Sequence, residues 1–330
     1  MRKAIYLIFA LLFLLQLGDF LIDLELAIAI VTSIYMPVCF IFFFRRIDIF
    51  EQETWKDIAY VFLISCITLM IYTPFIPFVH SFFETLSYEN ISFWDMLLGV
   101  AIPEEIVKII PVLIILKTTT FINEPIDYII YSSISALGFA FLENIDYIYS
   151  YQNDDLNIVA VRSFFPTLMH MTTTSIIGYQ LYKFQKKKQN KKLNSYDYIY
   201  IILGFIIAAL SHTIYNLEEG GITLIVLCIY YSQLIKTTLK ESPFIDHSKI
   251  KKELTTENSV TNSGNFKILI SMTLGVLIMD LIFGYVHNGS FNYTMFENLK
   301  FIIIIFATIA GAALDKEDLE KIWSNLGKSK

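Results

Sequence analysis

The chain has 330 residues, of which 55% are hydrophobic and only 17% are charged, and it contains 28 Phe and 20 Tyr. This composition leaves too little polar surface for a soluble globular protein of that length, and a net charge of -6 without a strongly basic face argues against nucleic acid as a partner. The sequence therefore predicts a polytopic integral membrane protein surrounded by the lipid bilayer.

Apolar windows long enough to cross a hydrocarbon core, about 17 to 25 residues each, occur about ten times along the chain. The first window has the basic start of a signal peptide, but no small-x-small cleavage site follows it, so we interpret it as a retained span. In chain order the windows are 4–22, 26–44, 58–79, 93–116, 128–149, 161–183, 198–216, 221–237, 267–286 and 299–314. We expect an all-α transmembrane helical bundle.

The positions of Lys and Arg predict the orientation of these spans, because short basic loops stay on the cytoplasmic side. Every second connection is basic, as with Arg45 and Arg46 after the second window and KFQKKKQNKK after the sixth. The intervening connections carry mainly Asp and Glu. Ten spans with both termini in the cytoplasm satisfy this alternation.

One polar stretch divides the chain near its C-terminal end. Residues 238–266 contain TTENSVTNSGN and are expected to form a flexible cytoplasmic linker. The predicted parts are N-terminal transmembrane helices at 1–79, a core at 80–237, this linker, and a C-terminal helical pair with a tail at 267–330.

Four consecutive predicted spans carry ionisable or amide side chains. A charged residue within a span costs about 2.5 to 3.5 kcal/mol on insertion scales, so such residues are candidates for function. They are Glu104, Glu105, Lys108, Glu143, Asn144, His170, His212 and Asn216. Counted from the outer end of each span at about 1.5 Å per residue, the first glutamate, Glu143 and the two histidines lie roughly 7 to 16 Å deep. All fall in the outer half of the membrane, so we expect them to converge on one site that opens to the extracytoplasmic side.

Two histidines and a carboxylate form a good ligand set for zinc, and a catalytic zinc keeps three protein ligands and a water molecule. The expected ligands are Glu143, His170 and His212. Glu104 is then the expected general base, with Glu105 as second choice. Lys108 lies four residues after the first glutamate and three after the second, so it can pair with either.

A metal-free arrangement stays open. In it, Glu104 and His170 activate the water, while His212 and Asn216, one helical turn apart on the same face, stabilise the oxyanion. In either arrangement Asn144 and Asn216 are expected to support ligands or the oxyanion.

These residues fall into four ordered motifs. EEIVK at 104–108 fits EExxK, FAFLEN at 139–144 fits FxxxEN, HMTTTSIIG at 170–178 fits HxxxSxxxG with Thr174 at the Ser position, and HTIYN at 212–216 fits HxxxN. Together with EPIDYIIYSSISALGFA before the second motif, they make residues 93–237 resemble the PrsW family of intramembrane proteases, which is related to the CAAX prenyl proteases and the bacteriocin-processing group.

The resemblance implies a helical metalloprotease in the bacterial cytoplasmic membrane. It also implies a membrane-anchored protein substrate, such as an anti-sigma factor, cleaved near the extracytoplasmic face. A proton-coupled transporter or channel is the alternative class, because it too buries Glu, His and Lys. Such a protein is expected to scatter polar groups through the membrane and to have two halves with corresponding broken helices, whereas these residues cluster at one depth.

Simpler interpretations exist for each element. Glu104, Glu105 and Lys108 could form a buried ion pair that only fixes helix packing, and membrane histidines often donate hydrogen bonds between helices. The joint placement of all four motifs favours a catalytic site.

Overall fold

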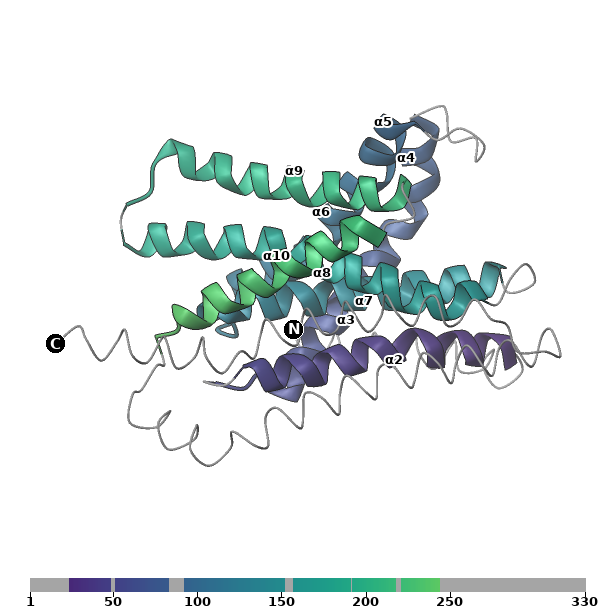
Figure 1. Cartoon of the computed structure of the whole chain (residues 1–330), viewed down its shortest axis with the longest axis horizontal. Helices are drawn as coiled ribbons and strands as arrows, with labels where there is room; N and C mark the ends of the chain where they lie inside the picture. Colours follow the sequence, from purple (N-terminus) through teal and green to yellow (C-terminus); the bar gives the residue numbers. More distant parts are fainter. Residues whose placement is uncertain are drawn as a thin grey trace.

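The computed structural model describes residues 24–48, 51–82, 92–151, 157–190, 192–217 and 221–243 (Figure 1). Every regular element within these ranges is a helix, which confirms the all-α class for this part of the chain. The predicted spans at 4–22, 267–286 and 299–314 lie outside the described residues, as does nearly all of the predicted linker.

The described helices follow one another with short connections. Two groups, α3 to α4 and α5 to α6, run on without a break between their members. The elements are α2 (Leu24–Ile47), α3 (Trp55–Tyr72), η1 (Thr73–Phe75), α4 (Ile76–Phe82), α5 (Phe93–Asp95), η2 (Met96–Ala101), α6 (Ile102–Thr118), α7 (Pro125–Tyr151), α8 (Asn157–Gln189), α9 (Ser195–Leu217) and α10 (Gly221–Lys240).

Five of these segments are long and apolar enough to cross a membrane. They are Ala29–Ile47, Trp55–Val79, Pro125–Ile148, Tyr196–Leu217 and Ile222–Lys240. The other two spans predicted in this part of the chain also form helices, α6 with its preceding turns and α8, but these carry the Glu-Glu-Lys cluster and a run of threonines. The chain is an integral membrane protein, and the total of ten spans and their orientation stay predictions.

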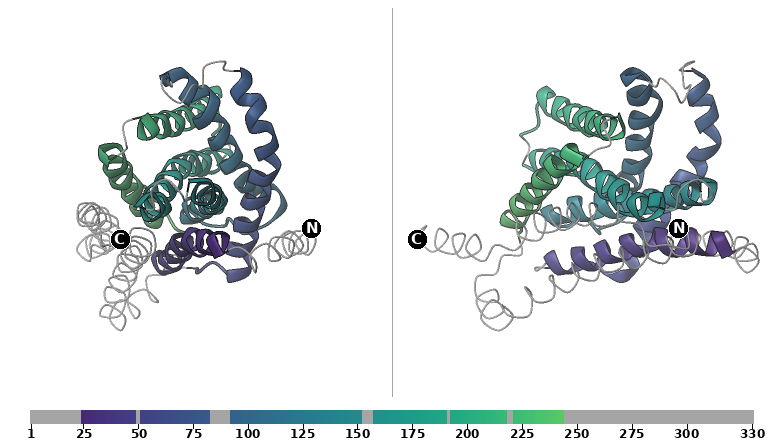
Figure 2. Two further views of the ribbon diagram at one scale, coloured as in Figure 1. Left: turned by 90° about the vertical axis from the view of Figure 1, so that its right-hand side faces the viewer. Right: turned by 45° about the vertical axis from the view of Figure 1, so that its right-hand side comes forward.

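Helix α7 lies at the centre of the bundle. Of its membrane-crossing window 94% is buried, against 28% for α9, which lies at the edge. Helices α7 and α8 lie between α2 on one side and α9 on the other (Figure 1), and the end-on view shows the other helices grouped around them (Figure 2, left). The central helix therefore sets the positions of its neighbours.

Small residues allow the helices around α7 to pack closely. A Cβ atom at Gly178 of α8 would clash with Ser132 Oγ and lie 2.5 Å from the carbonyl oxygen of Tyr128, both on α7. A Cβ atom at Gly138 of α7 would lie 2.6 Å from the carbonyl oxygen of Phe62 on α3. Such contacts between backbones are typical of helix pairs in membranes.

Replacing Gly178 with Ala should destabilise the bundle by about 1 to 3 kcal/mol, because the new methyl group would force α7 and α8 apart. Thermal unfolding of the detergent-purified protein, followed by Trp fluorescence, measures this effect. Gly204→Ala is the matched control, since the three atoms nearest to its Cβ all belong to the side chain of Gln180 and none to a backbone. Equal unfolding temperatures for the two variants would contradict the assignment of a close backbone contact.

Candidate active site

The first turn of α6 carries the two adjacent glutamates into the bundle. The helical segment begins at a capping box, in which the side chains of Ser92 and Asp95 each accept a hydrogen bond from the other's backbone N–H. A π-helical stretch, Met96–Ala101, follows, and Pro103 stands at the start of α6. Because π-helical turns change the rotational phase of a helix and recur at functional sites, this stretch sets the direction in which Glu104 and Glu105 point.

Glu105 is the central acceptor of the site. Its side chain is fully buried, and its Oε1 contacts Lys108 Nζ at 2.8 Å and His212 Nδ1 at 3.1 Å. Hydroxyl groups of α8 complete the set, with Thr173 donating to Oε1 and Thr174 to Oε2, both at 3.0 Å. One carboxylate thus joins α6, α8 and α9, and protein donors occupy both of its oxygens.

Lys108 and Glu143 fix the two nitrogens of His170. Lys108 is fully buried, and its Nζ lies 2.6 Å from His170 Nδ1 and 4.8 Å from the centre of the Phe139 ring. His170 Nε2 lies 2.7 Å from Glu143 Oε2. The donor and acceptor roles of the two ring nitrogens depend on the tautomer, and Nε2 is the nitrogen on the side of Glu143.

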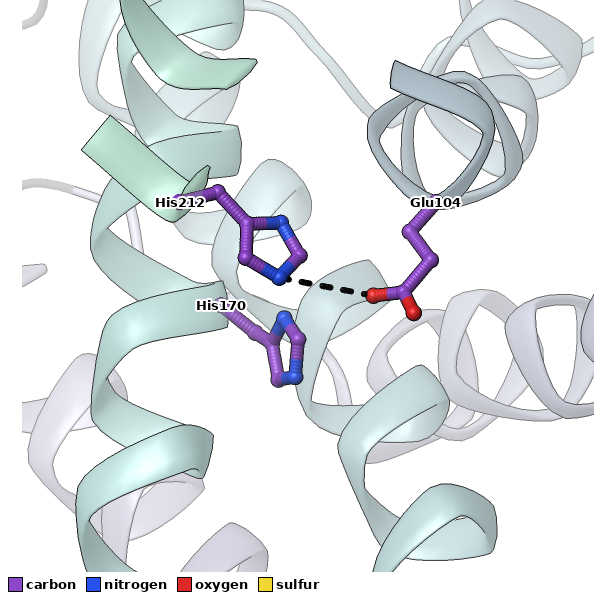
Figure 3. Close-up of side chains that lie close together, drawn as sticks. All are labelled: Glu104, His170 and His212. Carbon is purple, nitrogen blue, oxygen red and sulfur yellow. Dashed lines mark ion pairs between the residues drawn. The ribbon is translucent and has the colours of Figure 1, made fainter. Parts of the chain in front are cut away.

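Three side chains from three helices meet as a potential metal-binding group. Glu104, His170 and His212 each offer one ligand atom, and these atoms all lie within 4.8 Å of one another. His212 Nε2 lies 3.6 Å from Glu104 Oε2, and the rings of the two histidines contact edge to face with centroids 5.0 Å apart (Figure 3). Two imidazoles and a carboxylate fit the ligand preferences of zinc.

The structure brings the glutamates, the lysine and the histidines of all four motifs together, as their shared depth predicted. Glu143 contacts His170, but in the described part of the chain the three-residue metal-binding group contains Glu104 in its place. This exchange matters because Glu104 was the predicted general base and Glu143 the predicted ligand.

The two predicted asparagines have other contacts. Asn144 is buried and donates from Nδ2 to Thr167 Oγ1 of α8 at 3.0 Å. Asn216 donates to Met96 Sδ at 3.5 Å, which connects α9 to the π-helical stretch. These hydrogen bonds place both asparagines around the cluster rather than in direct contact with its histidines.

Thr173 and Phe139 were not among the predicted site residues. Thr173 lies three positions after His170, hence on the same face of α8, and this spacing was the signal that could have identified it. Phe139 begins the FxxxEN motif, and its ring contacts both Lys108 and His170, at 4.8 Å and 5.3 Å. Ser135 also supports the site, because its hydroxyl group donates to the carbonyl oxygen of Lys108 at 2.5 Å.

Several helices are apolar enough to cross a membrane, and the bundle encloses a buried cluster of histidines, carboxylates and one lysine. These features define a membrane protein with the side chains of a hydrolytic enzyme. Comparison with known proteins agrees. The chain belongs to the PrsW family of intramembrane metalloproteases, whose model matches residues 53–235. This match extends to α3, which the motif-based resemblance at 93–237 had left out.

Two relatives carry the name Protease PrsW. The protein of Oceanobacillus iheyensis is 25% identical over 195 residues, which cover 59% of this chain and 80% of the relative. The protein of Clostridioides difficile is 26% identical over 215 residues, which cover 63% of this chain and 87% of the relative. No solved structure matches the chain. The comparisons identify a membrane-embedded peptidase.

Proposed function

We propose that this protein is a zinc-dependent protease that hydrolyses a peptide bond of a membrane-anchored protein near the extracytoplasmic face. The observation that carries the proposal is the grouping of Glu104, His170 and His212 within 4.8 Å in a buried site. Further support comes from relatives that are named proteases. The outward-facing position rests on the predicted topology, in which the site lies in the outer half of the membrane.

In this proposal Glu104, His170 and His212 hold the zinc ion. Glu105 orients His212 by accepting a hydrogen bond from Nδ1–H, which leaves the lone pair of Nε2 on the side of Glu104. A zinc ion held there would lower the pKa of a bound water molecule and polarise the substrate carbonyl group.

Glu143 is the proposed proton acceptor. It is 17% exposed, whereas Glu105 is fully buried and already holds four protein donors. A carboxylate that takes a proton from water and passes it to the leaving amine must reach both, so a partly accessible side chain suits the role better. Lys108 keeps the charge of Glu105 balanced and holds His170 through Nδ1.

Metal content should separate the two glutamates. We expect about one zinc ion per chain in the detergent-purified wild type and in Glu143→Gln, and a 10- to 100-fold weaker affinity, hence little metal, in Glu104→Gln. Mass spectrometry of the metal provides the measurement. Thr213→Ala serves as control, because this buried hydroxyl donates only within α9, to the carbonyl oxygen of Ala209.

Each other outcome supports a different assignment. Metal retained in Glu104→Gln but lost in Glu143→Gln would restore Glu143 as the ligand and Glu104 as the base. A folded wild type that cleaves protein without bound metal would support the metal-free arrangement. A folded wild type that neither cleaves nor binds metal, but moves protons across vesicle membranes, would support the transporter.

A further inference from the structure

Four buried carboxyl groups gather at the end of α7 opposite Glu143. Their residues are 0% exposed for Asp48 and Asp127, 2% for Glu124 and 9% for Glu53. Two belong to the connection between α2 and α3, and two lie at and just before the first turn of α7. We call these four residues the acid cluster. Its position is the end of the bundle predicted to face the cytoplasm.

Protein donors occupy one side of each carboxyl group. The backbone N–H of Glu53 donates to Asp48 Oδ2 at 3.1 Å, and those of Asn123 and Glu124 donate to Asp127 Oδ2 at 2.8 Å. The connection between α2 and α3 and the residues just before α7 are thus folded around the carboxyl groups. The acid cluster therefore fixes the geometry of these two connections.

Two hydroxyl groups join further helices to the acid cluster. Tyr131 of α7 donates to Glu53 Oε2, and Ser242, just after α10, donates to Glu124 Oε2. The acid cluster therefore connects the ends of α2, α3, α7 and α10 through side-chain hydrogen bonds.

The carboxyl groups also pair with one another. Asp48 lies close enough to Glu124, and Glu53 close enough to Asp127, for their charges to interact. Asp48 Oδ1, Glu124 Oε1 and Asp127 Oδ1 are buried without a protein donor. Two neighbouring carboxylates in a buried site disfavour the ionisation of both, so each pair favours the binding of a proton or another cation.

Further acidic residues act on the acid cluster. Glu51 adds negative charge near Glu124, and Asp57 does so near Glu53. The guanidinium of Arg45, three residues before Asp48, lies over the Trp55 ring, 4.2 Å from its centre. Among the residues that the structure describes, three metal-ligand atoms come within 4.8 Å of one another at the active-site cluster and not here, which favours protons over a metal ion.

We propose that the acid cluster is a proton-binding site that holds the ends of α2, α3, α7 and α10 together when its two carboxyl pairs are protonated, and that releases them when the cytoplasm becomes alkaline. This role is independent of peptide hydrolysis. Its ligand is the proton, and its effect is on the stability of the bundle.

The titration of the acid cluster gives the direction of the effect. Burial, followed by the charges of Glu124 and Asp127, raises the pKa of Asp48 to about 8, and burial raises the pKa of Glu53 to about 7. A carboxyl group with a raised pKa in the folded protein contributes stability that is complete below its unfolded pKa of about 4. That stability is lost as the pH rises to the folded pKa values, and because burial also raises the pKa of Asp127 to about 9, the loss continues to about pH 9.

Thermal unfolding between pH 6 and pH 9 tests the proposal on the full chain in detergent. We expect the wild-type unfolding temperature to fall by about 5 °C or more over this range, beyond the fall shown by Asp48→Asn. The amide introduced by Asp48→Asn mimics the protonated acid, so this variant should unfold above the wild type at pH 9. Glu124→Gln replaces the other member of the pair and should do the same. Asp146→Asn, at an exposed position elsewhere on α7, should keep the wild-type pH dependence.

Infrared spectra give a second measurement. The band of a protonated carboxyl group should be present in the wild type at pH 6 and weaker in Asp48→Asn. A wild-type unfolding temperature that is flat with pH, or one that changes equally in all variants, would overturn the proposal. So would recovery of the pH 6 stability at pH 9 on addition of Mg²⁺ or Ca²⁺ alone, which would identify a divalent cation as the ligand.

Discussion

Replacing His212 with Ala should lower peptide-bond cleavage by at least about 100-fold while the bundle stays folded. His212 is fully buried on α9, and its two ring nitrogens face Glu105 and Glu104 at 3.1 Å and 3.6 Å. Its loss removes one of three metal-ligand candidates and one of the four donors to Glu105. No other described side chain offers an imidazole at that position, so we expect no other residue to take over the role of His212.

The measurement compares new N-termini of membrane proteins, by mass spectrometry, in cells that produce the wild type or the variant. Termini that appear with the wild type and are missing with His212→Ala are the cleavage products. Thr213→Ala, the neighbouring residue on α9, should leave them unchanged because its hydroxyl bonds within its own helix. Products that persist at wild-type level in His212→Ala would remove this residue from the active site.

Replacing Lys108 with Met should destabilise the protein by about 3 to 5 kcal/mol, because it leaves the buried carboxylate of Glu105 without its cation. For a domain of this size that corresponds to a fall of roughly 10 °C in the unfolding temperature. Lys186→Met is the control. It breaks an ion pair whose members are 50% and 35% exposed, and such pairs contribute about 0 to 1 kcal/mol.

A second substitution separates charge from packing. The double variant Lys108→Met with Glu105→Gln removes both charges, so it should unfold at a higher temperature than Lys108→Met alone. If the double variant is less stable than the single one by the full cost of Glu105→Gln, the two side chains contribute independently and the charge pairing in this site has been misjudged.

The side chains of the site were predictable because a bilayer makes each of them conspicuous. Ionisable side chains are costly in hydrocarbon, so they are rare in membrane spans and usually functional. This applies to Glu104, Lys108, His170 and His212. The same residues explain why α6 and α8 fall short of the apolar pattern of a simple span. The polarity that marks the site weakens the signal of the helices that carry it.

The roles of the two partly exposed glutamates were harder to predict. Helical periodicity gives the angle between neighbouring residues, but the π-helical stretch Met96–Ala101 precedes Glu104 and changes the phase of the whole segment. Which carboxylate approaches the histidines then depends on packing between helices. Glu143 contacts one histidine, whereas Glu104 groups with both.

The acid cluster gave no signal in the sequence. Asp48 and Glu124 lie 76 positions apart at the ends of different helices, where carboxylates are ordinarily solvated. Only the fold shows that the connections turn inward and bury them, because burial of a loop residue depends on tertiary contacts that no local pattern encodes.

Glu105 takes its donors from α6, α8 and α9, so its hydrogen bonds can be complete only after all three helices have been synthesised. Of these three helices, α6 leaves the ribosome first, and His212, near the end of α9, follows about a hundred residues later. Until α9 enters the membrane and packs, the nascent chain lacks His212 and one of the four donors to Glu105. With the proposed ligands, hydrolytic competence would be acquired late in biogenesis, after α9 has packed against α6 and α8.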